Sequence, residues 1–312
     1  MAPKAPASVR TVYSILSDPL IFSATTLTAM MTLGWYVYAS KLKRTTRVLD
    51  QHMTKQFKLI EKIKINHNTS LYRFALPHSK DVLGLPVGKY ISISINIDGK
   101  EVVRNYTPTS GNETKGYFDL IIKTYPTGLV SNYISQLEIG DKIDIQGPKG
   151  TYSYTPNVMK EIVMIAGGTG LTPMLPIIRS TLKNTQDKTK LTLIYANNTI
   201  DDILLKGELD RLERKYSDQF RVHHVLATPP PTTTTTTTSS SSSQSSPLLN
   251  DYSIGFVTKD VLARWLPSPS NDIQLLLCGP PPMIADVEKF VIELGFDPPK
   301  EVSKLTDQVF KF

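Results

Sequence analysis

The chain has 312 residues, of which 40% are hydrophobic, and a formal net charge of +7. This length and apolar share predict two domains plus an appendage. Cys278 is the single cysteine, which excludes an intramolecular disulfide and a thiolate-built metal cluster and favours a folded part that faces the cytosol. The positive charge is compatible with an acidic partner or a membrane surface without choosing between them. The histidines show no metal-ligand spacing, so we expect no metal site.

Residues 21–39 form an uncharged segment, IFSATTLTAMMTLGWYVYA, preceded by a terminal tail over 1–20. As a helix, this segment is long enough to cross a hydrocarbon core of about 30 Å. Its aromatic carboxyl end, with Trp35 and Tyr36, is followed at once by a basic tether over 40–54, which predicts a single-pass anchor with the later domains in the cytosol. A cleaved signal sequence and a buried core helix are the alternatives. The choice between endoplasmic reticulum and mitochondrial outer membrane stays open.

Short apolar runs separated by turn signals fill residues 55–156, which is the pattern of a small antiparallel β barrel of the Greek-key type. In Tyr90–Ile97, isoleucines alternate with polar residues, and Asp98-Gly99 follows, where a tight hairpin requires positive φ angles. Further strands are expected from Val102 onward, over Tyr117–Tyr125 and over Ile139–Gly150, with a short helical stretch that carries Ile134 and Leu137.

After Pro156, apolar strands alternate with amphipathic helices, the sequence pattern of a parallel sheet with crossover helices. Residues 157–312 are therefore expected to form a doubly wound α/β domain. Leu205, Leu209 and Leu212 share one helix face, for example. The expected strands are Ile162–Ala166, Leu191–Ala196, Arg221–Ala227 and Ile273–Cys278, and the expected helices lie near 173–184, 203–216, 259–266 and 283–294.

Residues 229–250 interrupt this pattern with prolines, a threonine run and a serine run. Such a segment cannot bury enough apolar surface to offset its ordering entropy, so we expect a disordered insertion. We interpret it as a tolerated surface loop, because loop-closure entropy grows slowly with length. A cluster of regulatory phosphorylation sites is the alternative.

Two segments of the predicted barrel carry groups that bind phosphates and flat rings. In Arg104-Asn105-Tyr106-Thr107, the guanidinium supplies paired donors for a pyrophosphate, while the tyrosine ring and the short hydroxyl can flank and hydrogen-bond a flavin. An arginine that only caps a strand end is the alternative. Gly128-Leu129-Val130-Ser131 opens a short helix directly after Lys123-Thr124-Tyr125, and its exposed amide donors suit an anionic phosphate. Any loop–helix junction can begin with glycine and serine, so the evidence for this segment is its position directly after the strand.

The third segment is Gly167-Gly168-Thr169-Gly170, which follows a predicted strand and opens a helix with Leu171-Thr172-Pro173. Glycines let the backbone approach a dinucleotide closely, and the helix amino end attracts its phosphates. Pro173 suits a first helical position, where no amide donor is needed. Pro176 departs from the residues that usually follow such a glycine segment. Because proline has no backbone N–H, it removes one hydrogen bond early in the helix, and this loss should be tolerable.

The fourth segment, Cys278-Gly279-Pro280 and onward to Met283, follows the last predicted strand, and ligands of open α/β sheets bind outside the carboxyl ends of their strands. We do not assign Cys278 as a nucleophile, because a lone cysteine at a strand end is most often buried filler. Tyr195–Leu205 resembles the reductase segment that lies beside the adenosine ribose, where a carboxylate such as Asp202 would accept from the 2′-hydroxyl, repel a 2′-phosphate and favour NADH over NADPH. An acid that complements a helix dipole is the alternative for Asp202.

The first segment resembles the R-x-Y-[ST] signature of the ferredoxin reductase-like flavoproteins, and the second resembles their second FAD segment. With GGTG[IL]TP and CGPPPM in this order, the chain resembles the NADH-cytochrome b5 reductases over residues 55–312, including the terminal DQVFKF. The resemblance implies FAD and NADH as cofactors, with hydride passing from NADH to FAD and electrons leaving singly. It implies Thr107 and Cys278 as catalytic positions, Thr107 near the flavin and Cys278 with Thr169 near the nicotinamide. The implied cofactor-binding residues are Arg104, Tyr106, Thr107, Lys123, Tyr125, Gly128, Val130, Ser131, Gly167, Gly168, Thr169, Gly170, Thr172, Pro173, Asp202, Cys278, Gly279, Pro280 and Met283.

The resemblance also implies an acceptor, cytochrome b5, whose acidic heme rim would dock on a basic surface. Fungal relatives are expected to supply electrons to a small iron protein of diphthamide synthesis as well. We expect a monomer without a nucleic-acid partner. The alternatives are an NADH reductase of the same fold with another acceptor, such as a quinone or another heme protein, and a catalytically idle flavoprotein that acts as a membrane tether.

Overall fold

The computed structural model describes residues 28–35, 46–230 and 252–312, and it divides the chain into two compact units, Met1–Thr46 and Arg47–Phe312. In the first unit, residues 28–35 are helical and expose Trp35. The remainder of the predicted anchor, like most of the predicted insertion 229–250, lies outside the described residues. Within the described residues, we find no helix with the length and apolar character needed to cross a bilayer.

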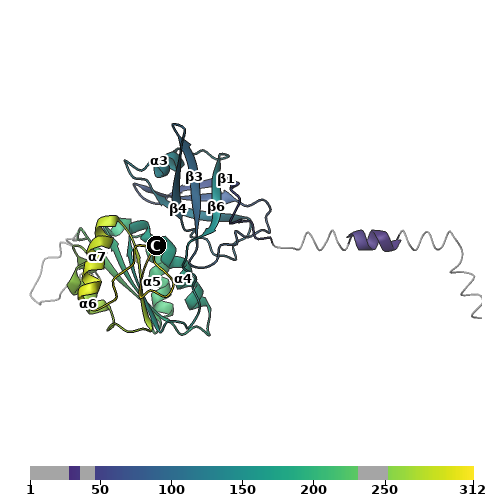
Figure 1. Ribbon diagram of the computed structural model, residues 1–312. Coiled ribbons are helices and arrows are strands. Elements are labelled where there is room, and N and C mark those ends of the chain that lie inside the picture. Colours follow the sequence, from purple (N-terminus) through teal and green to yellow (C-terminus); the bar gives the residue numbers. More distant parts are fainter. Residues whose placement is uncertain (1–27, 36–45, 231–251) are drawn as a thin grey trace, which may run out of the picture. The chain divides into compact units, whose positions relative to one another are not determined.

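The larger unit begins with a six-stranded antiparallel barrel in the order β4-β3-β6-β1-β2-β5 (Figure 1). Alternate side chains of each strand fill its core, where the ring of Phe118 stacks on Phe74 and meets the edge of Phe57. The elements are β1 (Lys55–Lys64), β2 (Thr69–Ala75), β3 (Tyr90–Ile97), β4 (Lys100–Tyr106), β5 (Tyr117–Lys123), α3 (Leu129–Gln136) and β6 (Lys142–Lys149). The predicted barrel is confirmed.

The hairpin between β3 and β4 turns at the predicted dipeptide. Asp98 and Gly99 have φ angles of 51° and 77°. Two consecutive left-handed residues give the turn a twist that matches the flanking strands, and aspartate and glycine tolerate this conformation better than most residues. The turn brings β4, and with it Arg104, back alongside β3 in the register Ile93 to Arg104.

A parallel sheet with the order β10-β9-β8-β7-β11-β12 follows the barrel. Its elements are β7 (Glu161–Gly167), η1 (Gly168–Gly170), α4 (Leu171–Lys183), β8 (Lys190–Asn197), η2 (Ile200–Asp202), α5 (Lys206–Lys215), β9 (Phe220–Leu226), β10 (Tyr252–Ile254), α6 (Lys259–Trp265), β11 (Ile273–Cys278), α7 (Pro281–Glu293) and β12 (Val309–Lys311). The edge strands β10 and β12 were not predicted, because three residues are too few to show a period. Pro176 is tolerated inside α4, as expected.

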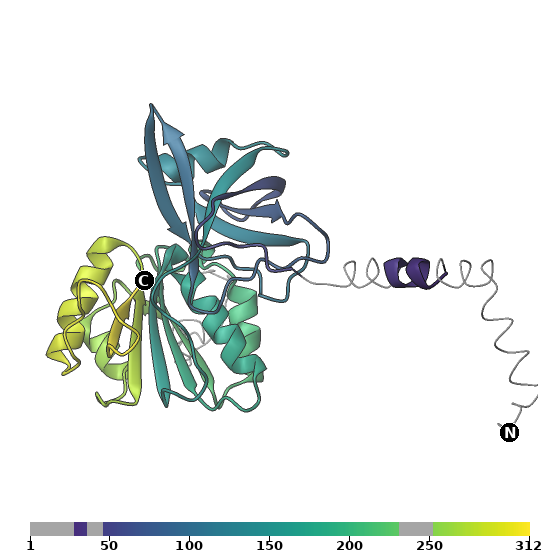
Figure 2. The same ribbon diagram turned by 45° about the vertical axis from the view of Figure 1, so that its right-hand side comes forward.

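Helices cover both faces of this sheet (Figure 2). Ile162 and Met164 of β7 belong to a core shared with α4 and α5, whereas Val163 and Ile165 belong to a core shared with α6 and α7. A strand buried on both faces shows a continuous apolar run instead of an alternating one. The predicted doubly wound arrangement is therefore confirmed, and the strand order reverses between β7 and β11.

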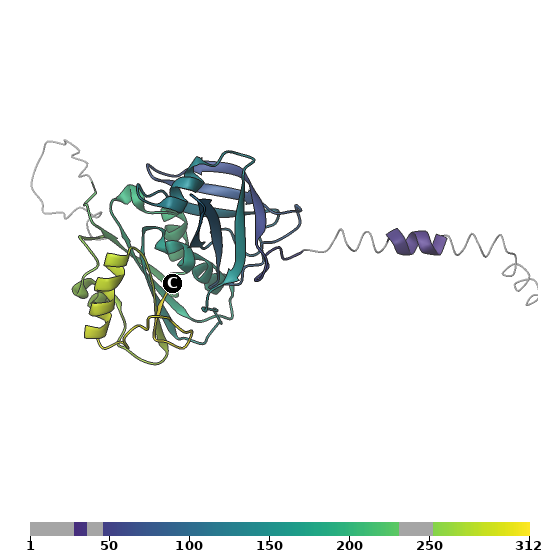
Figure 3. The ribbon, with the colours of Figure 1, turned by 45° about the horizontal axis from the view of Figure 1, so that its top comes forward.

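The barrel and the α/β half lie side by side in the larger unit (Figure 3), and polar side chains link them. The Tyr152 hydroxyl donates to Gln274 Oε1 over 3.0 Å. The guanidinium of Arg179 on α4 donates to the backbone oxygen of Thr109 in the barrel. The same guanidinium forms two 2.7 Å hydrogen bonds to the carboxylate of Glu208 on α5. Arg179 therefore ties α4 and α5 to the barrel loop that follows β4.

We predict that Arg179→Met lowers the free energy of unfolding by about 1–2 kcal/mol, because it leaves the Glu208 carboxylate and the Thr109 carbonyl without their donor at a partly exposed site. Urea unfolding measures this change. Lys183→Met is the matched control on the same helix: its ion pair with Glu113 also reaches the barrel, but the two side chains are 72% and 69% exposed. We expect less than about 0.5 kcal/mol there. Equal losses in the two variants would contradict the assigned role of Arg179.

Candidate functional site

A cleft of 640 Å³ lies between the barrel and the carboxyl ends of β7 and β11. Cavities of several hundred Å³ are the usual size of cofactor sites. The position is also the expected one, because ligands of open α/β sheets bind where the strand order reverses. The cleft is lined by Tyr90, Arg104, Asn105, Tyr106, Thr107, Ile121, Ile122, Lys123, Tyr125, Thr127, Gly128, Leu129, Val130, Ser131, Gly167, Thr169, Gly170, Thr172, Pro173, Cys278, Gly279, Pro280, Pro281 and Phe312.

The end of β4 supplies the barrel wall of the cleft. Arg104 is exposed and donates from Nη1 to the adjacent Val103 oxygen over 2.8 Å. Tyr106 is largely buried, and desolvation raises the pKa of its phenol to about 12, so the ring stays neutral. The Thr107 side chain is only 8% exposed. This wall thus offers a cation, a neutral aromatic ring and a hydroxyl in succession.

Helix α3 begins at the cleft without a side-chain cap. Gly128 is its N-cap residue, and the Ser131 hydroxyl donates back to the Gly128 oxygen over 3.1 Å. The same hydroxyl accepts from the Tyr125 amide over 3.3 Å. A methyl group on Gly128 would lie 2.3 Å from Ser131 Oγ, so a larger residue would displace this hydroxyl from its hydrogen bonds. The uncapped first-turn amides and the helix dipole suit a phosphate.

The loops after β7 and β11 contact each other at the floor of the cleft. A Cβ on Gly170 would lie 2.0 Å from the Cys278 backbone oxygen, and one on Gly167 would lie 2.7 Å from the Met283 sulfur. Gly168 adopts a φ of +55°, which side chains disfavour, and its oxygen accepts from the Tyr195 hydroxyl over 2.9 Å. The glycines therefore let two backbone turns approach closely enough to form one surface.

Cys278 ends β11 and lies in the cleft wall. Burial raises the pKa of its thiol to about 12. A thiol with such a pKa stays protonated at neutral pH, whereas a nucleophilic cysteine requires the thiolate. The sequence-based interpretation likewise assigns no nucleophile, and Cys278 is a neutral side chain in the cleft wall.

All but three of the residues implied by the resemblance line this cleft. The exceptions are Gly168, Met283 and Asp202. Gly168 and Met283 lie directly behind the lining and support the two loops. Asp202 is 7% exposed, and with Thr199 it forms the reciprocal capping box of η2. Its contact with a ribose stays a prediction.

Sequence reasoning missed several lining residues. Phe312, the last residue of the chain, reaches the cleft because its amide donates to the Leu277 oxygen beside Cys278. No local pattern indicated this position, although the terminal DQVFKF had been included in the resemblance. The other missed lining residues are Tyr90, Asn105, Ile121, Ile122, Thr127, Leu129 and Pro281. Most of them adjoin predicted residues in the chain.

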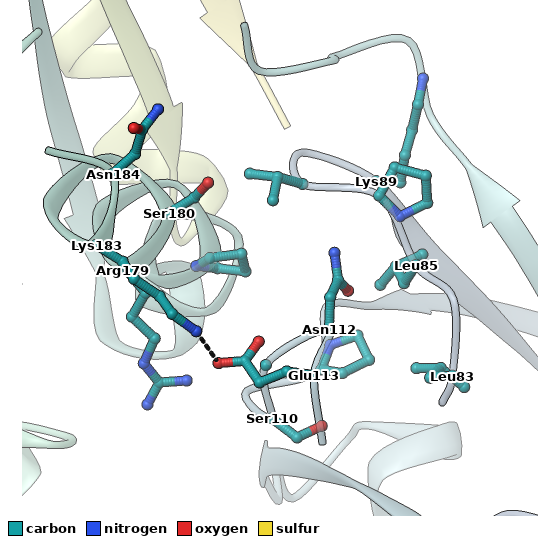
Figure 4. Close-up of a pocket in the computed structure, with 15 residues that line it drawn as sticks. Leu83, Leu85, Lys89, Ser110, Asn112, Glu113, Arg179, Ser180, Lys183 and Asn184 are labelled. Carbon is teal, nitrogen blue, oxygen red and sulfur yellow. Dashed lines mark hydrogen bonds and ion pairs between the residues drawn. The ribbon is translucent and has the colours of Figure 1, made fainter. Parts of the chain in front are cut away.

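A second cavity of 310 Å³ lies between the barrel and α4 (Figure 4). None of the residues implied by the resemblance lines it. Its cationic side chains are already engaged within the protein: Lys183 pairs with Glu113, Arg179 pairs with Glu208, and Lys89 donates to the Gly150 oxygen. The cationic side chains at this cavity thus already have partners within the protein, and the larger cleft is the candidate site.

The larger cleft suits anionic dinucleotides. Its lining residues, which are all within the described ranges, include Arg104 and Lys123 but no aspartate or glutamate. Cationic walls attract phosphates, and the glycine loop and the start of α3 present backbone amides to them. Among the described residues, no group of three or more His, Cys, Asp or Glu side chains could hold a metal ion. The cations and backbone amides of the cleft therefore suit phosphates, and its aromatic side chains suit flat rings.

Comparison with known proteins agrees with this geometry. Residues 56–154 match the model of the oxidoreductase FAD-binding domain, and residues 164–289 match that of the oxidoreductase NAD-binding domain. NADH-cytochrome b5 reductase 1 of Candida albicans is 46% identical over 295 residues, which cover 95% of each chain. The Mortierella alpina protein of the same name is 48% identical over 267 residues, which cover 86% of this chain and 84% of that relative.

Solved structures show the same fold. The cytochrome b5 reductase domain of Ulva prolifera nitrate reductase superposes with a TM-score of 0.71 and 34% identity, covering 86% of this chain and all of that domain. The CS-b5R domains of human Ncb5or, solved in an NAD+ form, give a TM-score of 0.64 at 24% identity, covering 83% of this chain and 69% of that one, and so support the fold alone. The chain belongs to the NADH-cytochrome b5 reductases, a family of FAD- and NAD-binding oxidoreductases.

Proposed function

We propose that this chain is an NADH-cytochrome b5 reductase that takes hydride from NADH and delivers electrons singly to cytochrome b5. The observation that carries the proposal is the convergence of four separate segments on one cleft, two from the barrel and two from the parallel sheet. The names of the fungal relatives support the acceptor. Electrons could also pass to a small iron protein of diphthamide synthesis.

The barrel side of the cleft is the proposed FAD site. Arg104 and the amides at the start of α3 would hold the diphosphate, since the guanidinium and the uncapped helix both attract phosphate oxygens. Tyr106, Thr107 and Tyr125 would contact the flat ring system, the neutral phenol of Tyr106 by packing and the Thr107 hydroxyl by hydrogen bonding. Ser131 would act through the turn that it stabilises with Gly128.

The sheet side of the cleft is the proposed NADH site. Gly167, Thr169 and Gly170 would approach the dinucleotide with their backbone, and the loop from Cys278 to Pro280 would hold the nicotinamide. The close contact of these two loops supports this assignment, because it leaves one continuous surface next to the barrel wall. Lys123, from the barrel side, would face the bound dinucleotide with its ammonium group.

When bound, the cofactors would supply the redox chemistry, which is hydride transfer from NADH to FAD and release of single electrons. The chain's own residues bind, orient and exclude water. Thr107 and the protonated Cys278 thiol would flank the reacting rings without exchanging a proton, because the high pKa of the thiol keeps it neutral. Orientation of this kind can supply a large share of the rate enhancement.

We also propose that residues 21–39 anchor the chain in the mitochondrial outer membrane or the endoplasmic reticulum, with the cleft facing the cytosol. The uncharged stretch, its aromatic carboxyl end and the basic residues that follow support the anchor. Two cofactor-binding halves within one chain support a monomer as the working unit. An anchored reductase would meet an acceptor held on the same membrane.

The central test uses the full chain purified in mild detergent. We expect a yellow protein that oxidises NADH faster than NADPH and reduces both ferricyanide and cytochrome b5. Reduction of ferricyanide without transfer to cytochrome b5 would indicate another acceptor, and flavin without any NADH oxidation would indicate an idle tether. A colourless and inert protein would contradict the proposal altogether.

We predict that Gly170→Ala lowers kcat/KM for NADH by on the order of 10²-fold, because its methyl group must displace the Cys278 carbonyl by more than 1 Å from the surface that orients the nicotinamide. The variant should retain its flavin absorbance, since the barrel is unchanged. Gly207→Ala is the control: a Cβ there meets nothing within 4 Å. Undiminished NADH turnover by Gly170→Ala would remove this loop from the proposed site.

For the anchor, we predict that the full chain remains with cell membranes after washing at alkaline pH, whereas a chain beginning at Arg47, where the larger compact unit begins, is released. Fractionation and immunoblotting measure both. Release of the full chain by the wash would refute a spanning segment, and retention of the shorter chain would locate membrane attachment elsewhere.

A further inference from the structure

The second cavity, of 310 Å³, lies between α4 on one side and two barrel loops, residues 83–89 and 108–113, on the other (Figure 4). Its apolar lining consists of Leu83, Leu85, Pro86, Val87, Pro108 and Pro176. The two leucines are each 6% exposed and belong to the barrel core, so this wall is firmly packed. The volume lies at the lower end of the range for small-molecule sites. The cavity therefore suits a small ligand with an apolar body.

Prolines shape the apolar lining from both sides. Pro86 and Pro108 come from the barrel, whereas Pro176 stands inside α4. Pro176 departs from the residues that usually follow the glycine segment, and it does not line the cofactor cleft. Proline rings pack against flat aromatic rings where proteins recognise proline-rich peptides. We therefore expect the apolar body of a ligand here to be aromatic.

The polar lining carries more positive than negative charge. The residues around the cavity, all within the described ranges, include the cations Lys89, Arg179 and Lys183 and one acid, Glu113. Lys183 reaches Glu113 from α4 across one side of the cavity, with 3.0 Å between Nζ and Oε1 (Figure 4). These two side chains are 72% and 69% exposed, and an exposed pair stabilises a protein little. A carboxylate can therefore replace Glu113 as the partner of Lys183 at small cost.

The second cavity and the cofactor cleft share two structural elements. In the barrel, Thr107 lines the cleft and the next residue, Pro108, lines the cavity. On α4, Pro173 lines the cleft, and Pro176 lines the cavity about one turn later. A ligand in the cavity would thus touch both the barrel segment and the helix that form walls of the cleft.

We propose that the second cavity is an effector site for a small aromatic carboxylate, which places its ring against the prolines and its carboxylate on Lys183. A ligand that contacts α4 and the barrel loops together binds best at one separation of the two, and it therefore biases the separation of the cleft walls. The binding site is independent of the proposed function, whereas its effect on NADH oxidation rests on that function.

The probe is 2-naphthoate, and 2-naphthamide is its neutral match, because an amide has the size of a carboxylate without the charge. Calorimetric titration of the purified full chain in mild detergent, against a detergent blank, gives each Kd with and without NAD+. We expect a Kd on the order of 0.1–1 mM for 2-naphthoate, as for other ligands of this size. The Kd of 2-naphthamide should be about threefold higher. Saturating 2-naphthoate should change kcat/KM for NADH by about fivefold.

Two charge variants test the assigned contact. Lys183→Gln should raise the Kd of 2-naphthoate about threefold and leave that of 2-naphthamide unchanged, whereas Glu113→Gln should lower the Kd of 2-naphthoate about twofold by removing the competing acid. Lys289→Gln is the matched control: this lysine of α7 is 71% exposed, also pairs with one acid, Asp286, and does not line the cavity. It should change neither Kd.

Ser180→Leu tests the location, because Ser180 lines the cavity from α4 and a leucine there would fill part of it. We expect the Kd of both probes to rise about tenfold, with flavin absorbance and thermal midpoint reporting on the fold of each variant.

Several results would overturn the inference: displacement of 2-naphthoate by NAD+, equal Kd values for the two probes, or unchanged binding by Lys183→Gln or by a folded Ser180→Leu variant. Binding without any change in kcat/KM would overturn the effector role. A chain that binds 2-naphthoate as described but does not oxidise NADH would contradict the proposed function and leave the binding site in place.

Discussion

The site depends on the close approach of two backbone turns where the strand order of the parallel sheet reverses. The turn after β7 touches the turn after β11 because Gly170 has no side chain: a Cβ there would overlap the Cys278 carbonyl. Strands β7 and β11 are paired in register up to Ala166 and Cys278, so both turns leave the sheet at the same level. The sheet pairing brings the turns together, and glycine permits the contact.

The second wall of the cleft comes from another fold element, so its geometry depends on how the barrel is joined to the sheet. Arg179 stands on the helix that the glycine loop opens, and it donates to Thr109, two residues beyond Thr107 in the barrel motif. Tyr152 and Gln274 provide a separate buried link. Both contacts join the barrel to the parallel-sheet half at residues close in sequence to the walls of the cleft. They therefore fix the distance between the two walls.

The charges of the cleft are arranged in two layers. Arg104 and Lys123 face the space itself, where no lining aspartate or glutamate competes with a phosphate. The acid nearest to Lys123, Asp202, is buried behind it and is held by Thr199. An acid in the lining would repel an anionic dinucleotide, whereas a buried acid paired with a lysine has its charge compensated. The neutral thiol of Cys278 and the neutral phenol of Tyr106 add no further charge.

The sequence by itself determined the barrel, the parallel sheet and most of the cleft residues, because these follow from local signals: alternation in Tyr90–Ile97, continuous apolar runs such as Ile162–Ala166, and glycine or proline at required turns. Only the tertiary structure revealed the ion pair between Asp202 and Lys123 and the presence of Phe312 in the cleft. Asp202 looked like a ligand residue beside a helix start, yet its partner Lys123 lies on a strand of the other half. Phe312 reaches the cleft through pairing with β11. Spacing along a chain reports neighbours within one element, whereas contacts between distant segments arise only when the two halves pack together.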